Sequence, residues 1–280
     1  MHWLTTRFRI DLARPRVMGI VNVTPDSFFD GGRHADTAAA VALCNALLAD
    51  GADILDIGGE STRPGAGTPT LDEELARVLP VLRHAVTLGV PVSVDTSRPD
   101  VMRAALDLGV DIVNDVRALQ RPGALECLAS HPRAGVCLMH MRGEPGTMQV
   151  EAVYQDVVFE VGEFLQGRVD AARAAGVADE RIVVDPGIGF AKTAAHNVEL
   201  LCRQQELLRV GRPLLVGWSR KSTLGVITGR PVEDRLAASV AAALAAVQRG
   251  AAVLRVHDVA ATVDALKVWR SAASGEITQG

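Results

Sequence analysis

Short apolar runs recur along the 280-residue chain, and nearly every one ends on a polar residue that a buried strand does not need. There are eight such runs, and a stretch with helical periodicity follows each of them. The runs cover residues 17–21, 54–57, 92–94, 112–113, 136–139, 182–184, 214–216 and 253–256. Eight alternating strands and helices predict an α/β fold, a closed (β/α)8 TIM barrel, whose functional side chains lie at the carboxyl ends of the strands. The polar residues that end the runs are therefore candidate site residues.

Periodicity and capping residues predict the helices between these strands. We expect helices over about residues 37–50, 71–88, 99–108, 123–130, 150–175, 193–209, 235–249 and 259–273. Thr70 is a good N-cap for the second of them, and Pro99 suits a first helical turn. No linker rich in proline or serine interrupts the alternation, so residues 1–280 are expected to form a single domain. Residues 1–15 are expected to be an N-terminal extension before the first barrel strand.

Charge and composition exclude several classes of partner. The net charge is −4 and no basic run is long enough to follow a nucleic-acid backbone, so no nucleic-acid partner is expected. No stretch reaches the ~18 consecutive apolar residues of a membrane span, and the N-terminus has no signal-peptide pattern, so no membrane association is expected. The four cysteines, Cys44, Cys127, Cys137 and Cys202, form no CxxC pair. Reduced thiols and a cytoplasmic location are therefore expected.

The expected helix over residues 235–249 is apolar around most of its circumference. A barrel helix normally keeps one polar face toward solvent. The pattern therefore predicts that this helix packs against a second subunit, and that the chain forms a homodimer.

Three polar residues, Asp95, Asn114 and Asp185, end the third, fourth and sixth strands. Their side chains should converge at the barrel mouth, where a buried carboxylate needs a partner. A ligand with several N–H donors on one edge is such a partner, because a carboxylate accepts two parallel hydrogen bonds. The alternative is structural: the DPG sequence at residues 185–187 can form a turn, and the ND sequence at 114–115 a capping pair.

Positive charge accompanies the seventh and eighth strands. Lys221 follows the seventh strand, and Arg255 interrupts the apolar run of the eighth. Together with Arg63 and Arg220 from loops, they suit an anion or an electron-rich heterocycle. An arginine inside a barrel strand is costly unless it is paired or stacked, and an ion pair between Arg255 and Asp258 is the structural alternative.

Asn22, Arg63 and His257 could hold a leaving group that carries phosphate. Asn22 offers an amide oxygen to Mg²⁺, which is often bound by few protein ligands together with the phosphates of a substrate. Arg63 and His257 would neutralise phosphate oxygens. A lone histidine after a strand is more often structural, so His257 is a candidate only through its neighbours.

Two loops, residues 24–32 and 60–69, are longer than usual and combine glycine and proline with charged and hydroxyl residues, as a mobile lid does. Phe28 in the first loop and Phe190 after the sixth strand are candidates for stacking on an aromatic ligand. Residues 217–223 (GWSRKST) lack the second glycine of a Walker A loop, which argues against a nucleoside triphosphate. Ser222 is expected to begin a helical turn whose amides could bind a carboxylate.

Two further strand endings are assigned no chemical role. His140 lies between two methionines without a second metal-type ligand at the right spacing, so we expect a structural role for it and a pocket-wall role for Met139. Glu60 closes the second strand without an assigned function.

These segments together resemble dihydropteroate synthases, the folate-pathway enzymes that sulfonamides target. The matching segments are 18–32 (MGIVNVTPDSFFDGG), 56–65 (DIGGESTRPG), 93–96 (SVDT), 114–115 (ND), 139–149 (MHMRGEPGTMQ), 185–190 (DPGIGF), 219–222 (SRKS) and 255–257 (RVH). They occur in order over the whole barrel. The resemblance implies condensation of 6-hydroxymethyl-7,8-dihydropterin diphosphate with para-aminobenzoate, with Mg²⁺ on the leaving group, to give 7,8-dihydropteroate and diphosphate.

The resemblance also implies roles for individual residues. Those implied for the pterin are Asp95, Asn114, Met139, Asp185, Gly217, Lys221 and Arg255. Those implied for the diphosphate are Asn22, Arg63, Arg255 and His257, with Asn22 as the metal ligand. Those implied for para-aminobenzoate are Phe28, Thr62, Pro64, Phe190, Lys221 and Ser222. Asp185, Lys221 and Asp30 would take part in catalysis, and Asp30 would orient the waters of the metal. Phe29 departs from the family, which more often has a small hydroxyl residue there.

Departure of diphosphate would leave a cation that the pterin delocalises, so a dissociative route needs charge stabilisation more than a strong base. Closure of the two long loops would exclude water. The alternatives are a corrinoid-linked methyltransferase that binds methyltetrahydrofolate, a class I aldolase with Lys221 as Schiff base, and a non-catalytic pterin-binding paralogue. Arg63 and the segments 219–222 and 255–257 favour the synthase, because the pterin of the methyltransferases carries no diphosphate.

Overall fold

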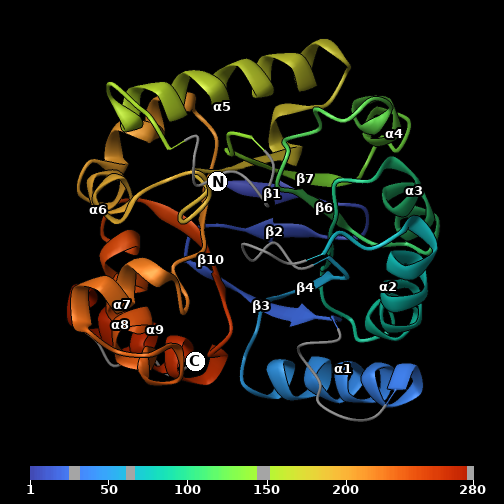
Figure 1. Ribbon diagram of the computed structural model, residues 1–280, viewed down its shortest axis with the longest axis horizontal. Coiled ribbons are helices and arrows are strands. Elements are labelled where there is room, and N and C mark those ends of the chain that lie inside the picture. Colours follow the sequence, from blue (N-terminus) through green and yellow to red (C-terminus); the bar gives the residue numbers. More distant parts are fainter. Residues whose placement is uncertain (25–31, 61–66, 144–151, 276–280) are drawn as a thin grey trace.

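Figure 1 shows the computed structural model, in which helices surround a ring of strands. The structure describes residues 1–24, 32–60, 67–143 and 152–275. Within these ranges eight parallel strands close into a barrel in the order β10-β3-β4-β5-β6-β7-β8-β9. They are β3 (Arg16–Asn22), β4 (Ile54–Gly58), β5 (Val92–Asp95), β6 (Ile112–Asp115), β7 (Gly135–Met139), β8 (Ile182–Asp185), β9 (Leu214–Val216) and β10 (Ala251–Val256). The predicted TIM barrel is confirmed.

The side chains of these strands alternate between two cores. Inward-facing Met18, Ile54 and Val183 belong to the cluster that fills the barrel. Outward-facing Val17 and Leu55 belong to the larger cluster beneath the helices. Helices cover the outer face of the sheet, and side chains fill the inside of the barrel. Both faces of each strand are therefore apolar, and the strands appear in the sequence as continuous apolar runs.

The expected helices are present, with shifted ends. They are α1 (Gly32–Ala49), α2 (Leu71–Ala85), α3 (Pro99–Asp107), α4 (Ala124–Ala129), α5 (Val157–Ala174), α6 (Ala194–Cys202), α7 (Ser222–Thr228), α8 (Leu236–Val247) and α9 (Val259–Ser274). The structure also contains the 3-10 helices η2 (Asp179–Arg181), η3 (Gln204–Val210) and η4 (Val232–Asp234). The predicted cap of α2 is confirmed as a capping box, in which the Thr70 hydroxyl accepts from the Glu73 amide and the Glu73 carboxylate accepts from the Thr70 amide.

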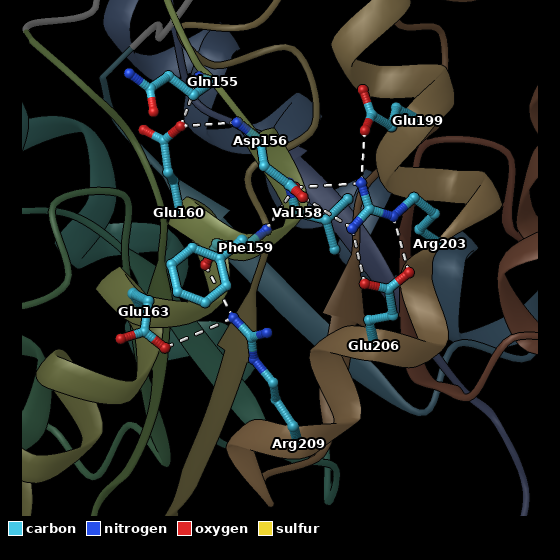
Figure 2. A network of polar contacts seen from close by, with 10 residues as sticks. All are labelled: Gln155, Asp156, Val158, Phe159, Glu160, Glu163, Glu199, Arg203, Glu206 and Arg209. Carbon is cyan, nitrogen blue, oxygen red and sulfur yellow. Dashed lines mark hydrogen bonds and ion pairs between the residues drawn. The ribbon is translucent and has the colours of Figure 1, made fainter.

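The largest shifts lie at the start of α5 and the end of α6, and a side-chain contact joins these two helix ends. Asp156 caps α5 by accepting from the amides of Val158 and Phe159, so the helix begins at residue 157 and not at 150. Arg203, directly after α6, donates to both oxygens of Asp156 at 3.2 and 3.1 Å, as Figure 2 shows. This contact fastens the two helix ends together across 47 residues of sequence, and the chain continues after Arg203 as η3.

The N-terminal extension contains two strands that the sequence analysis did not predict. It forms a hairpin of β1 (His2–Leu4) and β2 (Arg9–Asp11), which crosses the middle of the ring of strands in Figure 1. Trp3 is fully buried against the barrel-filling cluster, and its Nε1–H donates to the carbonyl of Arg181 at 2.9 Å. Gly135 allows this approach, because a Cβ there would lie 3.0 Å from the indole nitrogen of Trp3. The hairpin therefore closes the amino-terminal end of the barrel, here called the base.

Two further expectations concerned the state of the cysteines and the presence of a membrane-spanning helix. All four cysteines are free thiols, as predicted, and three of them are buried. Among the described helices, none combines the length and the apolar composition that crossing a bilayer requires.

Candidate active site

The polar strand endings gather at the carboxyl ends of the strands, here called the mouth of the barrel. Asp95 and Asn114 are register partners on β5 and β6, and Met139 and Asp185 are register partners on β7 and β8. Asn22 on β3 lies beside Gly58, which in turn pairs with Asp95. Five of the predicted site residues therefore lie at the ends of barrel strands around the mouth, with Met139 and Asp185 two residues beyond the register of Asn114.

In the mouth, Arg255 bridges the carboxylates of Asp56 and Asp95. Its Nε donates to Asp56 Oδ2 and its Nη2 to Asp95 Oδ2, each at 2.6 Å. Burial works against the charged form of Arg255, but the two carboxylates raise its pKa above the ordinary value. The alternative pairing with Asp258 is wrong, because Asp258 is bound by Arg220 at 2.5 Å. Arg255 is thus held in the mouth, as its position inside an apolar run predicted.

Asp56 is a site residue that the sequence reasoning missed. It is completely buried on β4, and besides Arg255 it accepts a hydrogen bond from Asn114 Nδ2 at 3.2 Å. A signal was available, since a carboxylate interrupts the apolar run 54–57 just as Arg255 interrupts the run 253–256. The amide of Asn114 therefore does not cap a turn. That structural role belongs to Asp115, which accepts from the amides of Arg117 and Leu119.

Asp185 combines the predicted turn with a place in the mouth. It is 6% exposed, and its Oδ1 accepts from the amide of Gly187 at 2.7 Å. Gly187 has φ +70°, and a Cβ there would lie 1.9 Å from the carbonyl oxygen of His140, so only glycine fits. The turn and the site role are compatible, because the second oxygen of Asp185 is not needed by the Gly187 contact.

The loop after β8 is stabilised by a buried lysine, Lys192, which the sequence analysis did not identify. Lys192 donates to the carbonyls of Gly187 and Phe190 at 3.0 and 2.9 Å and lies 2.8 Å from His140 Nδ1. Burial lowers the pKa values of both Lys192 and His140 well below their ordinary ranges. His140 is 1% exposed, which agrees with the structural role expected for it.

Lys221 and Phe190 meet on one side of the mouth. The ammonium nitrogen of Lys221 lies 4.3 Å from the centre of the Phe190 ring, within cation–π range. Phe190 also packs against the cluster that contains Met139 and Met141. Ser222 follows Lys221 directly and begins the predicted helical turn, α7, where it is exposed.

Burial shifts the titration of the acids in the mouth. It raises the pKa of Asp95 to about 7; the charge of Arg255 opposes this shift, and Asp56 adds to it. It raises the pKa of Asp185 to about 6, against the opposing hydrogen bond from Gly187. Shifted acids of this kind are typical of sites that bind or transform a ligand.

Burial shifts the basic groups in the opposite direction. It lowers the pKa of Lys221 to about 8, and the charge of Arg255 acts in the same direction. It lowers the pKa of His257 to about 3, again with help from Arg255. His257 is therefore uncharged at neutral pH, so without a ligand it offers an N–H group and not the positive charge that was expected of it. Ser219 holds this ring, with its Oγ 3.0 Å from His257 Nδ1.

Six residues singled out from the sequence lie outside the described residues. They are Phe28, Phe29, Asp30, Thr62, Arg63 and Pro64. Glu60, the last described residue before the second gap, remains without an assigned role.

The residues present were also tested against the expected Mg²⁺. The described side chains include no group of three or more His, Cys, Asp or Glu that could hold a metal ion. Asn22 at the end of β3 offers one half-buried amide. One amide oxygen fits Mg²⁺ that is carried mainly by the phosphates of a substrate and does not fit a metal held by protein ligands alone.

Comparison with known proteins agrees with this geometry. Residues 18–257 match the family described as pterin binding enzyme, so the barrel and its mouth define a member of that class. A dihydropteroate synthase of Neisseria meningitidis serogroup B is 53% identical over 275 residues, which cover 96% of each chain. The chain belongs to the dihydropteroate synthase family.

Two solved dihydropteroate synthases extend the similarity to the fold. That of Xanthomonas albilineans, described with 4-aminobenzoic acid, is 52% identical, with a TM-score of 0.90 over 95% of this chain and 96% of that one. That of Burkholderia cenocepacia, described as complexed with 7,8-dihydropteroate, is 49% identical, with a TM-score of 0.89 over 98% and 97% of the two chains.

Proposed function

We propose that this chain condenses 6-hydroxymethyl-7,8-dihydropterin diphosphate with para-aminobenzoate to give 7,8-dihydropteroate and diphosphate. The observation that supports the proposal is the cluster of buried carboxylates, amide and cations at the mouth of the barrel. Asp95, Asn114 and Asp185 offer acceptors and a donor to the N–H and carbonyl edge of a pterin. A flat heterocycle of that polarity matches the groups present.

The pterin would bind in the mouth, where some residues would contact its polar edge and others the face of its ring. The Asp95 and Asp185 carboxylates would accept from the N–H groups of the pterin, and Lys221 would donate to its oxygen or ring nitrogen. Arg255 would lie against the face of the ring, with Gly217 and Met139 completing the pocket. Gly217 lies next to Arg255, since a Cβ at Gly217 would be 3.9 Å from the Cβ of Arg255.

The chemical step requires the site to stabilise the positive charge that develops on the pterin. As the bond between the methylene carbon and oxygen breaks, diphosphate leaves with the electron pair and the pterin acquires positive charge. Asp185 is ionised at neutral pH, because its pKa is about 6, and would stabilise this cation. The lone pair of the para-aminobenzoate nitrogen then forms the new C–N bond, and that nitrogen releases one proton, which passes to water.

Para-aminobenzoate would lie on the side of the mouth formed by Phe190, Lys221 and Ser222. The Phe190 ring offers an apolar wall, and the start of α7 offers backbone amides to the carboxylate. Thr62, Pro64 and Phe28 are proposed to complete this subsite. Sulfonamides, which share the shape and charge of this substrate, are proposed to compete for it.

The diphosphate would be bound by Asn22, Arg63, Arg255 and His257. If the Ser219 hydroxyl donates to His257 Nδ1, the ring proton stays on Nε2 and can be donated to a phosphate oxygen. We propose that Asn22 would hold the Mg²⁺ of the diphosphate, and that the metal would supply positive charge to the leaving group. Asp30 is proposed to orient the waters of the metal.

We also propose that the chain forms a homodimer through α8 and its neighbours. Val226 and Ile227 on α7 are 72% and 62% exposed, and Val232 and Leu236 are 43% and 46% exposed on η4 and α8. Exposed apolar side chains on neighbouring elements are typical of an interface. The four free thiols support a reducing, cytoplasmic location, and we propose that residues 1–280 form one domain.

Diphosphate release tests the proposed activity. The chain is incubated with the pterin diphosphate, para-aminobenzoate and Mg²⁺, and each component is omitted in turn. We expect release only in the complete mixture, a strong loss for Asp185→Asn, and normal rates for Asp53→Asn at the base of the barrel. Absence of release from the wild-type chain, or full activity of Asp185→Asn, would overturn the proposal.

A further inference from the structure

Asp56 is a buried carboxylate whose charge the barrel does not require. It is fully buried in the middle of β4, and no described group donates to its Oδ1. Removing a carboxylate from water costs free energy that an apolar side chain of similar size would not. The packing of the barrel therefore does not account for the negative charge at this position.

The contacts of Asp56 lead only to other residues of the mouth. Its Oδ2 accepts from Arg255 Nε at 2.6 Å and from Asn114 Nδ2 at 3.2 Å. Both donors belong to residues that the proposed function assigns to the pterin. One buried oxygen thus organises a stacking residue from β10 and a hydrogen-bonding residue from β6.

The two carboxylates that bind Arg255 differ in their access to the mouth. The side chain of Asp56 is 0% exposed and that of Asp95 is 16% exposed. Asp56 binds Nε, close to the aliphatic stem, whereas Asp95 binds Nη2 at the tip. The inner contact determines the plane of the guanidinium, and the outer contact is the one that a ligand can reach.

We propose that Asp56 is the positioning residue of the pterin site: it anchors Arg255 and Asn114 from below, so that Asp95 can exchange Arg255 for the N–H donors of the pterin. The inference rests on the proposed function, because it takes the pterin as the ligand of Asp95. Without Asp56, both arms of the guanidinium can turn to Asp95 and form a bidentate pair, which is the preferred geometry of arginine with a carboxylate. The pterin then competes with Arg255 for Asp95.

Replacing Asp56 by asparagine keeps the size of the side chain and removes its charge. Hydrogen bonds to charged groups contribute about 1.5–3 kcal/mol, so we expect the Kd for the pterin diphosphate to rise by roughly 10- to 100-fold. The KM for para-aminobenzoate should stay within about twofold, since Asp56 contacts neither Phe190 nor Lys221. A general loss of barrel structure would instead raise both constants.

The pH dependence of pterin binding separates positioning from a general loss of structure. Asp95 accepts from the pterin only when ionised, so wild-type binding should weaken as the pH falls below about 7. The charged groups that face Asp95 from the neighbouring elements are Asp56, Glu60, Arg255, Asp115 and Lys221. In Asp56→Asn one of the repelling charges is gone and Arg255 is closer to Asp95. The acidic limb should therefore move to lower pH, whereas simple structural damage would weaken binding equally at every pH.

Isothermal titration with the pterin diphosphate and Mg²⁺ between pH 5.5 and 8.5 tests the proposal on the full chain. Asp53→Asn is the matched control, because Asp53 precedes the same strand at the base and pairs with Arg14 and Arg16. It should bind like the wild type. A wild-type chain that binds no pterin would overturn the proposed function itself. Normal binding by Asp56→Asn in a chain whose wild type binds would overturn only the role of Asp56.

A double variant keeps the test decisive if Asp56→Asn alone folds poorly. Arg255→Met combined with Asp56→Asn removes both buried charges together, which is milder than leaving either one unpaired. An asparagine in place of Asp56 still offers an oxygen to Asn114 Nδ2, so the double variant should bind the pterin within about threefold of Arg255→Met alone if the charge of Asp56 acts through Arg255. A further tenfold loss in the double variant would mean that Asp56 acts independently of Arg255, and would overturn the proposal.

Discussion

The base and the mouth of the barrel both contain buried carboxylates, but the contacts of these carboxylates differ. At the base Asp111 is fully buried and accepts from the backbone and guanidinium of Arg7 and from the amide of Val92. In the mouth Asp56 shares one oxygen between Arg255 and Asn114, and no described group donates to the other. The carboxylate at the base is saturated by the protein, and the one in the mouth is not.

This difference follows from what each end can bind. A carboxylate surrounded by protein donors contributes to stability and has no capacity left for a ligand. Burial raises the pKa values of Asp95 and Asp185 in the mouth, and a ligand that brings donors would complete the contacts of these two carboxylates. Variants at the base should therefore change the free energy of unfolding, and variants in the mouth should change catalysis.

The largest effect is expected for Lys221→Met. A buried ammonium with a pKa of about 8 is charged at neutral pH and would contact both substrates, so its loss should lower kcat/KM by roughly 100-fold or more. The free energy of unfolding should stay the same or rise, because a buried charge is replaced by an apolar chain. Steady-state kinetics and urea unfolding measure the two quantities. Lys267→Met, in an exposed pair on α9, is the control and should change neither.

The second effect is expected at the base. Asp111→Asn leaves Arg7 without its carboxylate and should lower the free energy of unfolding by about 3 kcal/mol, with unchanged KM values. Urea unfolding measures the loss. Asp264→Asn removes a carboxylate that is 78% exposed and should cost less than about 0.5 kcal/mol. A large loss of activity in folded Asp111→Asn would show that the two ends are not independent.

The sequence predicted the mouth better than the base, and the reason is physical. Strand endings in a barrel must meet, so Asp95, Asn114 and Asp185 could be placed together from the order of the apolar runs alone. The hairpin of β1 and β2 has strands of only three residues, and its main partners are distant: Trp3 binds the carbonyl of Arg181, 178 residues away. No local periodicity reveals such a contact.

The missed site residues have the same explanation. The charge of Asp56 was visible inside an apolar run, but its partner Arg255 lies 199 residues further along the chain. Arg255 was assigned a possible partner three residues away, Asp258, because nearby residues are the ones that sequence reasoning can pair. The cap of α5, Asp156, is likewise bound by Arg203, which lies 47 residues further along the chain. Pairings of this length come from closure of the barrel and not from any segment.

The third effect concerns pH and Asp95. Its pKa is about 7 in the folded chain and ordinarily near 4, so the folded state binds the extra proton between these values. The stability that this proton provides is fully present below about pH 4. It is lost progressively as the pH rises from about 4 through about 7. Asp95→Asn lacks this loss, so its stability relative to the wild type should rise by roughly 2 kcal/mol between pH 5 and 8. Thermal unfolding at both pH values measures the difference, and a constant difference would contradict the assigned shift.

The smallest effect is expected for Trp3→Phe, which tests whether the hairpin belongs to the base alone. The substitution keeps an aromatic ring in the buried cluster and removes the hydrogen bond from Nε1 to the Arg181 carbonyl. A buried carbonyl that loses its donor costs about 1 kcal/mol, so urea unfolding should show a loss of that order. The KM values and the pH dependence of pterin binding should be unchanged, because the packed interior of the barrel separates Trp3 from Asp56. A change in the pH profile without a loss of stability would mean that strain at the base reaches the carboxylates of the mouth through the barrel strands.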